Sequence, residues 1–226
     1  MLALVRLLQL ASPALPVGAY TYSQGLEWLV ESGEIKTEAD VAEWIGDLLE
    51  LGVGSFEAPL LAALIDAWQR DDAAELMRLN ADFLASRETA ELRAETVQMG
   101  YSLVRLLADL PGFAELTDWR ERLLAIDEPA FPTGWAAAAA AWRISCEMAL
   151  PAYLWAWLEN QVMAAVKTVP LGQSAGQRLL AALGERIPAV AERALALPEA
   201  DWHNFTPGLA LACSRHETQY TRLFRS

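Results

Sequence analysis

Cys213 and His216 are the residues that come closest to a metal site. They are three positions apart, so a helix would place the thiol and the imidazole one turn apart on the same face. Both groups are ligands that nickel and zinc accept. Two ligands make a weak site, however, and the chain has no HExxH or CxxC pattern. We therefore expect no bound metal here, only a buried thiol beside a solvent-facing histidine.

Two further segments match catalytic motifs in part. Ser23 lies in a near match to the nucleophile elbow G-x-S-x-G, but Thr21 replaces the first glycine and only two histidines are available as a base. The glycine-containing segment 172–177 lacks the lysine of a phosphate-binding loop. Neither a catalytic site nor a cofactor is predicted. The carboxylates of one charged helix are expected to be solvated and without catalytic function: Glu88, Glu91 and Glu95.

The elements that must position these residues are helices. Apolar residues recur at helical spacing, and no stretch shows the period-two alternation of a series of strands. The fold class is therefore all-α, a single compact bundle of roughly eight to eleven helices with Pro/Gly-punctuated loops. Capping residues, glycines and prolines predict helices over 2–10, 21–32, 38–51, 55–69, 73–85, 88–110, 118–126, 136–150, 152–168, 173–183 and onward from Pro188.

Three of these boundaries rest on particular residues. Thr21 and Gln24 have the spacing of a capping box and predict that a helix begins there. The run Gly52-Val53-Gly54 is expected to end one helix before Ser55 caps the next. Pro151 is expected to end the alanine-rich helix that begins near Ala136.

Composition limits the partners and the compartment. Lys and Arg total 17 against 30 Asp and Glu, and a formal charge of −13 gives no general attraction to nucleic acid. The two cysteines are far apart in the sequence, which fits a reducing cytoplasm. The uncharged run 7–26 contains two prolines and a glycine and lacks a basic start, so it predicts neither a membrane span nor a signal peptide.

Three polar segments are not explained by a role in the core: 13–27, 170–177 and 214–226. Tyrosine and arginine, which supply much of the binding energy at protein interfaces, are prominent in the first and last. Residues 207–226 carry three arginines against one glutamate on an otherwise acidic protein. We expect a helical domain over 1–206 and a flexible, basic C-terminal tail over 207–226 that binds a partner.

These segments resemble those of a known family. LQLASPALPVGAYTYSQGLE (8–27) resembles the N-terminal signature of the urease accessory protein UreF family, with Thr21 where the family often has serine. PLGQSAGQ (170–177) resembles its PLGQ-x-x-GQ segment, and SRHETQYTRLFRS (214–226) resembles its C-terminal tail. The three occur in the expected order along nearly the whole chain.

The resemblance implies an adaptor and not an enzyme. Members of the family pair with the accessory protein UreD (also called UreH), recruit the GTPase UreG and act on urease apoprotein, with GTP hydrolysis coupled to nickel delivery and lysine carbamylation. A homodimer is implied. Such an adaptor either only positions UreG or also modulates its GTP hydrolysis. Outside the family, the alternatives are an all-α scaffold for another cytoplasmic complex and an enzyme with an unrecognised pocket.

The resemblance also implies which residues bind partners. The tail that docks on UreD, and becomes ordered there, would comprise Arg215, His216, Glu217, Gln219, Tyr220, Arg222, Leu223, Phe224 and Arg225. Four residues of the opening motif are expected at the dimer or partner surface: Tyr20, Tyr22, Gln24 and Glu27. Gly172, Gln173 and Gln177 would shape the turn beside that surface.

Overall fold

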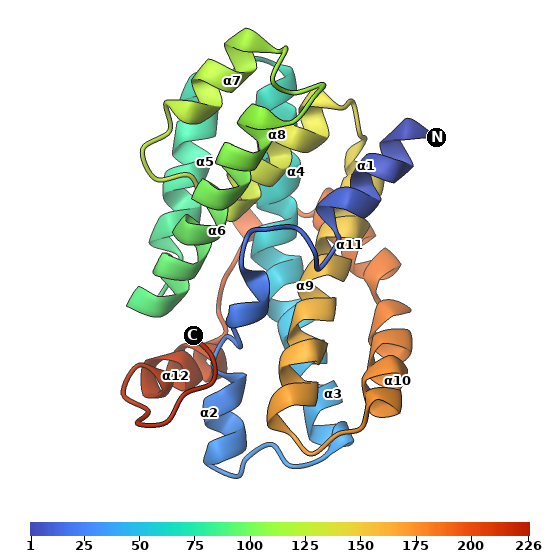
Figure 1. Ribbon diagram of the computed structural model, residues 1–226, viewed down its shortest axis with the longest axis vertical. Helices are drawn as coiled ribbons and strands as arrows, with labels where there is room; N and C mark the ends of the chain where they lie inside the picture. The colour runs from blue at the N-terminus through green and yellow to red at the C-terminus, as the bar shows by residue number, and fades with distance from the viewer.

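The computed structural model describes residues 1–226, and every regular element in it is helical (Figure 1). This confirms the all-α prediction. Two short 3₁₀ turns, Ala19–Thr21 and Glu199–Asp201, accompany the longer elements. The α-helices are α1 (Leu2–Leu10), α2 (Leu26–Glu31), α3 (Glu38–Asp47), α4 (Ala58–Gln69), α5 (Ala73–Ala85), α6 (Ala90–Asp109), α7 (Thr117–Leu124), α8 (Phe131–Ala141), α9 (Cys146–Thr168), α10 (Gln173–Gly184), α11 (Ile187–Ala196) and α12 (Pro207–His216).

The helices enclose one continuous core. In Figure 1, α5–α8 gather in the upper half, α2, α3, α10 and α12 in the lower half, and α4 and α9 run between them. A cluster of 57 buried apolar residues extends through both halves, which makes them one domain. The helix α9 contributes Tyr153, Leu154, Leu158 and Val162 to this core, where all four are buried.

The predicted capping box at Thr21 is wrong. Thr21 ends a 3₁₀ turn and its hydroxyl donates to the Gly18 carbonyl at 2.8 Å, whereas α2 begins only after Gly25. Gly25 has φ +77°, and a Cβ there would lie 2.8 Å from the Cβ of Ala212 in α12. Tertiary packing therefore places this helix start.

The expected break at Gly52-Val53-Gly54 is also wrong. A π-helical stretch, Leu48–Glu57, joins α3 to α4 in one helix from Glu38 to Gln69. A Cβ on Gly54 would lie 2.6 Å from Val190 Cγ1, so this glycine serves close packing against α11. The joined helix is long and apolar enough to cross a membrane, but 61% of its apolar window is buried in the protein, as in a core helix.

Pro151 does not end a helix. The chain breaks earlier, after α8, where Arg143 has φ +54° and the Ile144 N–H donates back to the Ala139 carbonyl at 2.9 Å. The helix therefore ends with a residue in the left-handed conformation. Such an end is usually recognised by a glycine or an asparagine, and here the residue is an arginine. Pro151 lies early in α9, where it removes a single helical hydrogen bond.

The C-terminal residues differ most from expectation, because residues 207–226 are folded onto the domain and do not extend from it. Half of them form α12, which has Pro207 in its first turn and packs its buried Ala212 and Cys213 against α2. The last ten residues turn back, and Phe224 and Ser226 are buried. The composition is polar, but a few apolar residues, Ala212, Cys213 and Phe224, are buried against the domain.

Candidate partner-binding site

The opening motif and the end of the chain form one structure. The backbone carbonyl of Ser226 accepts from the N–H of Ser23 at 2.6 Å, from the N–H of Gln24 at 3.1 Å and from the Ser23 hydroxyl at 2.7 Å. The Arg225 N–H donates to the Thr21 carbonyl at 2.8 Å. Because Ser23 is fully buried and donates to a backbone carbonyl, it is not placed as an exposed nucleophile.

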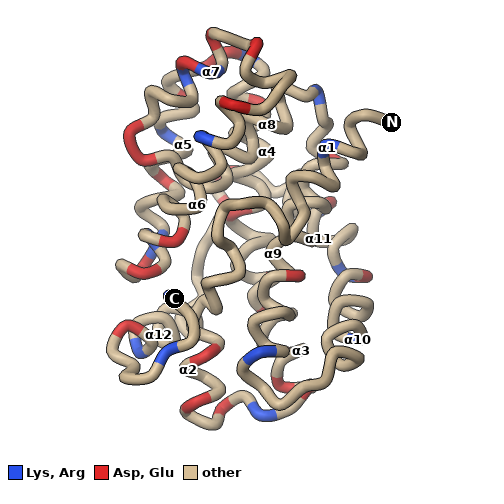
Figure 2. The backbone as a smooth tube through the Cα atoms, in the orientation of Figure 1, with Lys and Arg blue, Asp and Glu red and all other residues tan.

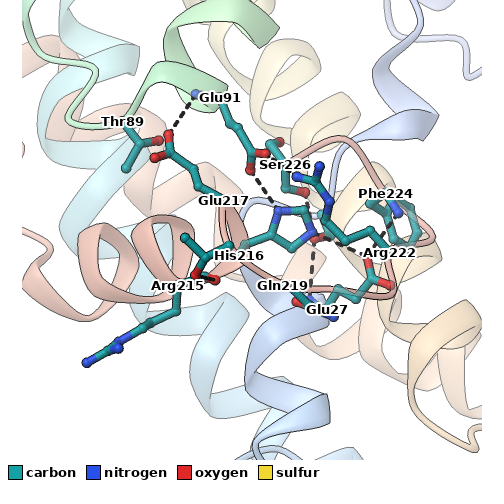
Figure 3. A network of polar contacts seen from close by, with 12 residues as sticks. Glu27, Thr89, Glu91, Arg215, His216, Glu217, Gln219, Arg222, Phe224 and Ser226 are labelled. Atoms are coloured by element: carbon teal, nitrogen blue, oxygen red, sulfur yellow. Dashed lines mark hydrogen bonds and ion pairs between the residues drawn. The ribbon is translucent and has the colours of Figure 1, made fainter.

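His216 lies between two carboxylates (Figure 3). Its Nδ1 is 2.7 Å from Glu91 Oε2 in α6, its Nε2 is 3.3 Å from Glu27 Oε2 in α2, and the side chain is fully buried. The expected solvent-facing histidine is therefore wrong, although the neighbouring Cys213 thiol is buried as expected and burial raises its pKa. Each ring nitrogen faces a carboxylate oxygen, which leaves neither free for a metal.

The same two carboxylates hold the end of the chain. Glu27 accepts from the backbone N–H of Leu223 at 2.6 Å and of Phe224 at 2.9 Å. Glu91 accepts from the Arg222 guanidinium. Figure 2 shows the basic positions of this segment close to acidic positions on α2 and at the start of α6. The basic end thus lies on carboxylates of its own domain.

Two more side chains join α12 and its continuation to neighbouring helices. Glu217 Oε1 accepts from the Glu91 N–H at 3.2 Å, at the N-terminal end of α6 where a carboxylate is favoured. The Gln219 amide donates to Glu31. Below, "the clasp" means the contacts that Glu27, Glu91 and Glu95 make with residues 216–226.

Glu95 is the member of the clasp that the sequence misassigned. It was expected on a solvated face, but it is 7% exposed, with its two oxygens accepting from Gln24 Nε2 and from the Ser226 hydroxyl, both at 2.8 Å. Burial raises its pKa to about 7. The Gln24 side-chain oxygen in turn accepts from Trp157 Nε1 at 3.0 Å and from Gln161 Nε2 at 3.1 Å. Gln24 therefore ties the opening motif to both α6 and α9.

A cavity of about 220 Å³ lies beside the clasp, between the opening loop, α6 and α9. Its walls are mostly apolar. At its polar side Arg87 pairs with Glu57 at 2.8 Å, and the Tyr153 hydroxyl donates to the second Glu57 oxygen at 3.1 Å. Burial raises the pKa of Tyr153. The charged groups satisfy one another, an arrangement typical of a structural polar cluster.

Comparison of the sequence with known proteins identifies the family of this chain. A model of the UreF family matches residues 35–184. The chain is 73% identical over its full length to the urease accessory protein UreF of Azoarcus sp. (strain BH72), of which it covers 97%. The chain belongs to the UreF family. It is also 61% identical to the protein of that name from Dechloromonas aromatica (strain RCB) and 51% identical to that of Methylobacillus flagellatus, covering 98% of each.

The matches to the first two of these relatives cover all of this chain, and so they include the opening motif and the C-terminal residues, which lie outside the family model. In the structure, most of the residues expected to bind partners in the opening motif and the C-terminal segment are either buried or exposed. The buried ones hold the C-terminal segment in place and are Tyr22, His216 and Phe224. Two partly buried residues, Gln24 and Glu27, contribute to the same contacts. The exposed ones are Tyr20, Arg215, Glu217, Tyr220, Arg222, Leu223 and Arg225.

Sequence reasoning missed Lys167 at this surface. Its ammonium lies 5.9 Å from the ring centre of Tyr20 and 5.5 Å from that of Phe224, so a cation from α9 lies over aromatic rings from both ends of the chain. Spacing along the sequence carries no signal for such a contact. "The outer face" below means Tyr20, Lys167, Tyr220, Leu223 and Arg225.

The segment at 170–177 leads from the end of α9 into α10. Gly172 precedes α10, and Gly172, Gln173 and Gln177 are exposed. In Figure 1, α10 and α12 lie on opposite sides of α9, and the turn before α10 follows the end of α9 that carries Lys167. A Cβ on Gly176 would lie 2.8 Å from Val166 Cγ2, which explains the small residue in this motif by close packing of α10 on α9.

Proposed function

We propose that this chain is the helical adaptor of urease maturation in the cytoplasm. It pairs with UreD (UreH), recruits the GTPase UreG and acts on urease apoprotein as a homodimer, supporting GTP-dependent nickel insertion without being an enzyme itself. The family membership supports a role as urease accessory protein. Binding to UreD, UreG and urease apoprotein, and the homodimer, are our proposals for this chain.

One observation carries the proposal. The two motifs that resemble the ends of the family's sequence, 203 positions apart, meet through Ser23 and Ser226 and present one outer face. That face combines exposed tyrosines, a leucine and cations, which is the composition of a protein-binding surface. On a chain of formal charge −13, it offers a local basic site.

We assign the outer face to UreD. Tyr220 and Leu223 are 102% and 65% exposed, and no buried contact in the chain depends on them. The turn at Gly172, Gln173 and Gln177 is assigned to a second contact, because its exposed residues begin α10, which lies on the opposite side of α9 from α12. Two separated surfaces suit an adaptor that holds two partners at once.

The first test measures urease activity and urease-bound nickel in cells that express the whole urease cluster. Deletion of this gene should leave urease protein present but nickel-poor and inactive, and its restoration should rescue both. Fully loaded urease in the deletion strain would contradict the role in maturation. A scaffold for another complex would then be the remaining function.

A second test separates the docking surface from general stability. Tyr220→Ala with Leu223→Ala should weaken binding of purified UreD by about tenfold or more. Met77→Ala with Leu195→Ala is the matched control, since both are exposed apolar residues on α5 and α11. Equal UreD binding by both double variants would contradict the assigned face.

A third test concerns the GTPase. UreG turnover is measured with and without a saturating amount of this chain and UreD. A change in turnover supports modulation of GTP hydrolysis, and unchanged turnover with intact binding leaves positioning as the role.

A further inference from the structure

The two hydrogen bonds of His216 require a charged ring. A neutral imidazole has one N–H and one bare nitrogen, whereas the imidazolium donates from both nitrogens. Here each nitrogen of the fully buried ring faces a carboxylate oxygen, Glu91 at 2.7 Å and Glu27 at 3.3 Å. With a neutral ring, one bare lone pair would face a carboxylate with no proton between them.

The other contacts of these carboxylates place the proton on the ring. Glu27 already accepts from two backbone N–H groups, and Glu91 from Arg222. A carboxylate that accepts several donors is favoured in its ionised form. With His216 protonated, two carboxylates face two cations, His216 and Arg222, and the charges balance. Loss of the ring proton leaves one uncompensated negative charge in a buried cluster.

We propose that His216 is a proton-dependent latch that fastens residues 217–226 to α2 and α6, and that loss of its proton releases them. Closing the clasp takes up a proton whenever the exposed ring is neutral, so the closed form is favoured at lower pH and weakens as pH rises. Release would expose Phe224 and disperse the outer face. That release controls docking rests on the proposed function, but the latch itself does not.

The charged and titratable groups around the ring come from four segments. Glu27 and Glu31 lie on α2, Glu91 and Glu95 on α6, Cys213 and Glu217 on or just after α12, and Arg222 on the last turn of the chain. Burial raises the pKa of Glu95 to about 7, and Glu95 also holds the Ser226 hydroxyl, so its contribution must be separated from that of His216. Glu95→Gln removes it.

The experiment measures hydrogen exchange of the full chain between about pH 6 and pH 9, with rates corrected for the intrinsic effect of pH. The readout is the protection factor of the Leu223 and Phe224 amides, with amides of α5 as the internal reference. In the wild type and in Glu95→Gln, protection should fall by up to about tenfold per pH unit as the ring loses its proton. In His216→Asn combined with Glu95→Gln, which lacks both titrating groups, it should be low and independent of pH.

Two further variants sharpen the test. His203→Asn changes the other histidine, which is exposed, and should keep the wild-type profile. Glu91→Gln places an amide donor opposite the ring, so a neutral imidazole suffices and the clasp should stay closed as pH rises. Constant protection in the wild type, or an unchanged fall with pH in the double variant His216→Asn with Glu95→Gln, overturns the latch. Because no partner is present, that failure would leave the proposed function untouched.

Ring nitrogen chemical shifts test the same point without a substitution. Labelled wild-type protein at about pH 6 should show an imidazolium signal for His216, with a proton on both ring nitrogens that face carboxylates. A neutral-ring signal for His216 in the folded chain would overturn the proposal.

Discussion

Glu95 on α6 accepts a hydrogen bond from the side-chain amide of Gln24, which belongs to the opening motif, at 2.8 Å inside the protein. This contact joins a residue of the family-like N-terminal motif to a carboxylate 71 positions away. It also places an ionisable group where water cannot solvate its charge.

Stability should therefore depend on Glu95 and pH. Its pKa is raised from 4.5 to about 7, so the folded form holds a proton that the unfolded form loses. The stabilisation is complete below about pH 4.5 and is lost as pH rises to about 7, by up to about 3 kcal/mol. Glu95→Gln should remove this dependence and be more stable than wild type at about pH 8, as measured by urea unfolding. Glu88→Gln, at an exposed position, is the control; equal pH profiles for the two variants would contradict the assignment.

The buried pair of Arg87 and Glu57 should be costly to break. Arg87→Met leaves the Glu57 carboxylate without its cation and should reduce the free energy of unfolding by about 3–5 kcal/mol. Arg70→Met, which removes an exposed partner of Asp66, should cost less than about 1 kcal/mol. Adding Glu57→Gln to Arg87→Met should recover part of the loss. Similar losses for Arg70→Met and Arg87→Met would show that burial does not decide the outcome.

Gly25 should control the docking of α12. Gly25→Ala combines a left-handed φ with a Cβ 2.8 Å from that of Ala212, so α12 must shift and the buried Cys213 should react faster with a thiol reagent. Gly18→Ala is the matched control, since Gly18 has φ +82° and open space around it. Labelling is followed at Cys213 after Cys146→Ser. Equal labelling rates in the two glycine variants would exclude packing as the cause.

Gly54 should be needed for the contact between the long helix and α11. An alanine Cβ would lie 2.6 Å from Val190 Cγ1 and 2.7 Å from the Leu49 carbonyl oxygen. Gly54→Ala should lower the free energy of unfolding by about 1–3 kcal/mol through overpacking. Gly172→Ala has no atom within 4 Å of its Cβ and should change it by less than about 0.5 kcal/mol. Thermal unfolding measures the change in both variants. An unchanged free energy of unfolding in Gly54→Ala would contradict the close packing.

Local signals predicted local structure well. Thr37 caps α3 as expected, with the Asp40 N–H donating to its hydroxyl at 3.2 Å, because both partners of a capping box lie within one turn. Thr21 and Gln24 have a similar spacing but do not form one. The Gln24 side chain instead forms hydrogen bonds with Glu95, Trp157 and Gln161, which are distant in the sequence.

The sequence pointed to segments with an unusual polar composition, but it did not indicate how these segments contact one another in the fold. The tail motif named residues of this segment, but nothing in their spacing indicated that His216 lies between Glu27 and Glu91 or that Lys167 lies near Tyr20. Such contacts depend on how α2, α6 and α9 pack. A charged residue on a helix was assumed to be solvated, and Glu95 is the exception because the end of the chain covers it.

The π-helical stretch from Leu48 to Glu57 also sets the rotational phase of everything that follows it in the long helix. Each residue of an α-helix turns the next by about 100°. Loss of a single residue within the stretch would restore ordinary helical pitch and turn Glu57 away from Arg87 and Tyr153, together with the α4 face that packs on α8. Among relatives, a gap in this helix would therefore mean a repacked interior and not merely a shorter one.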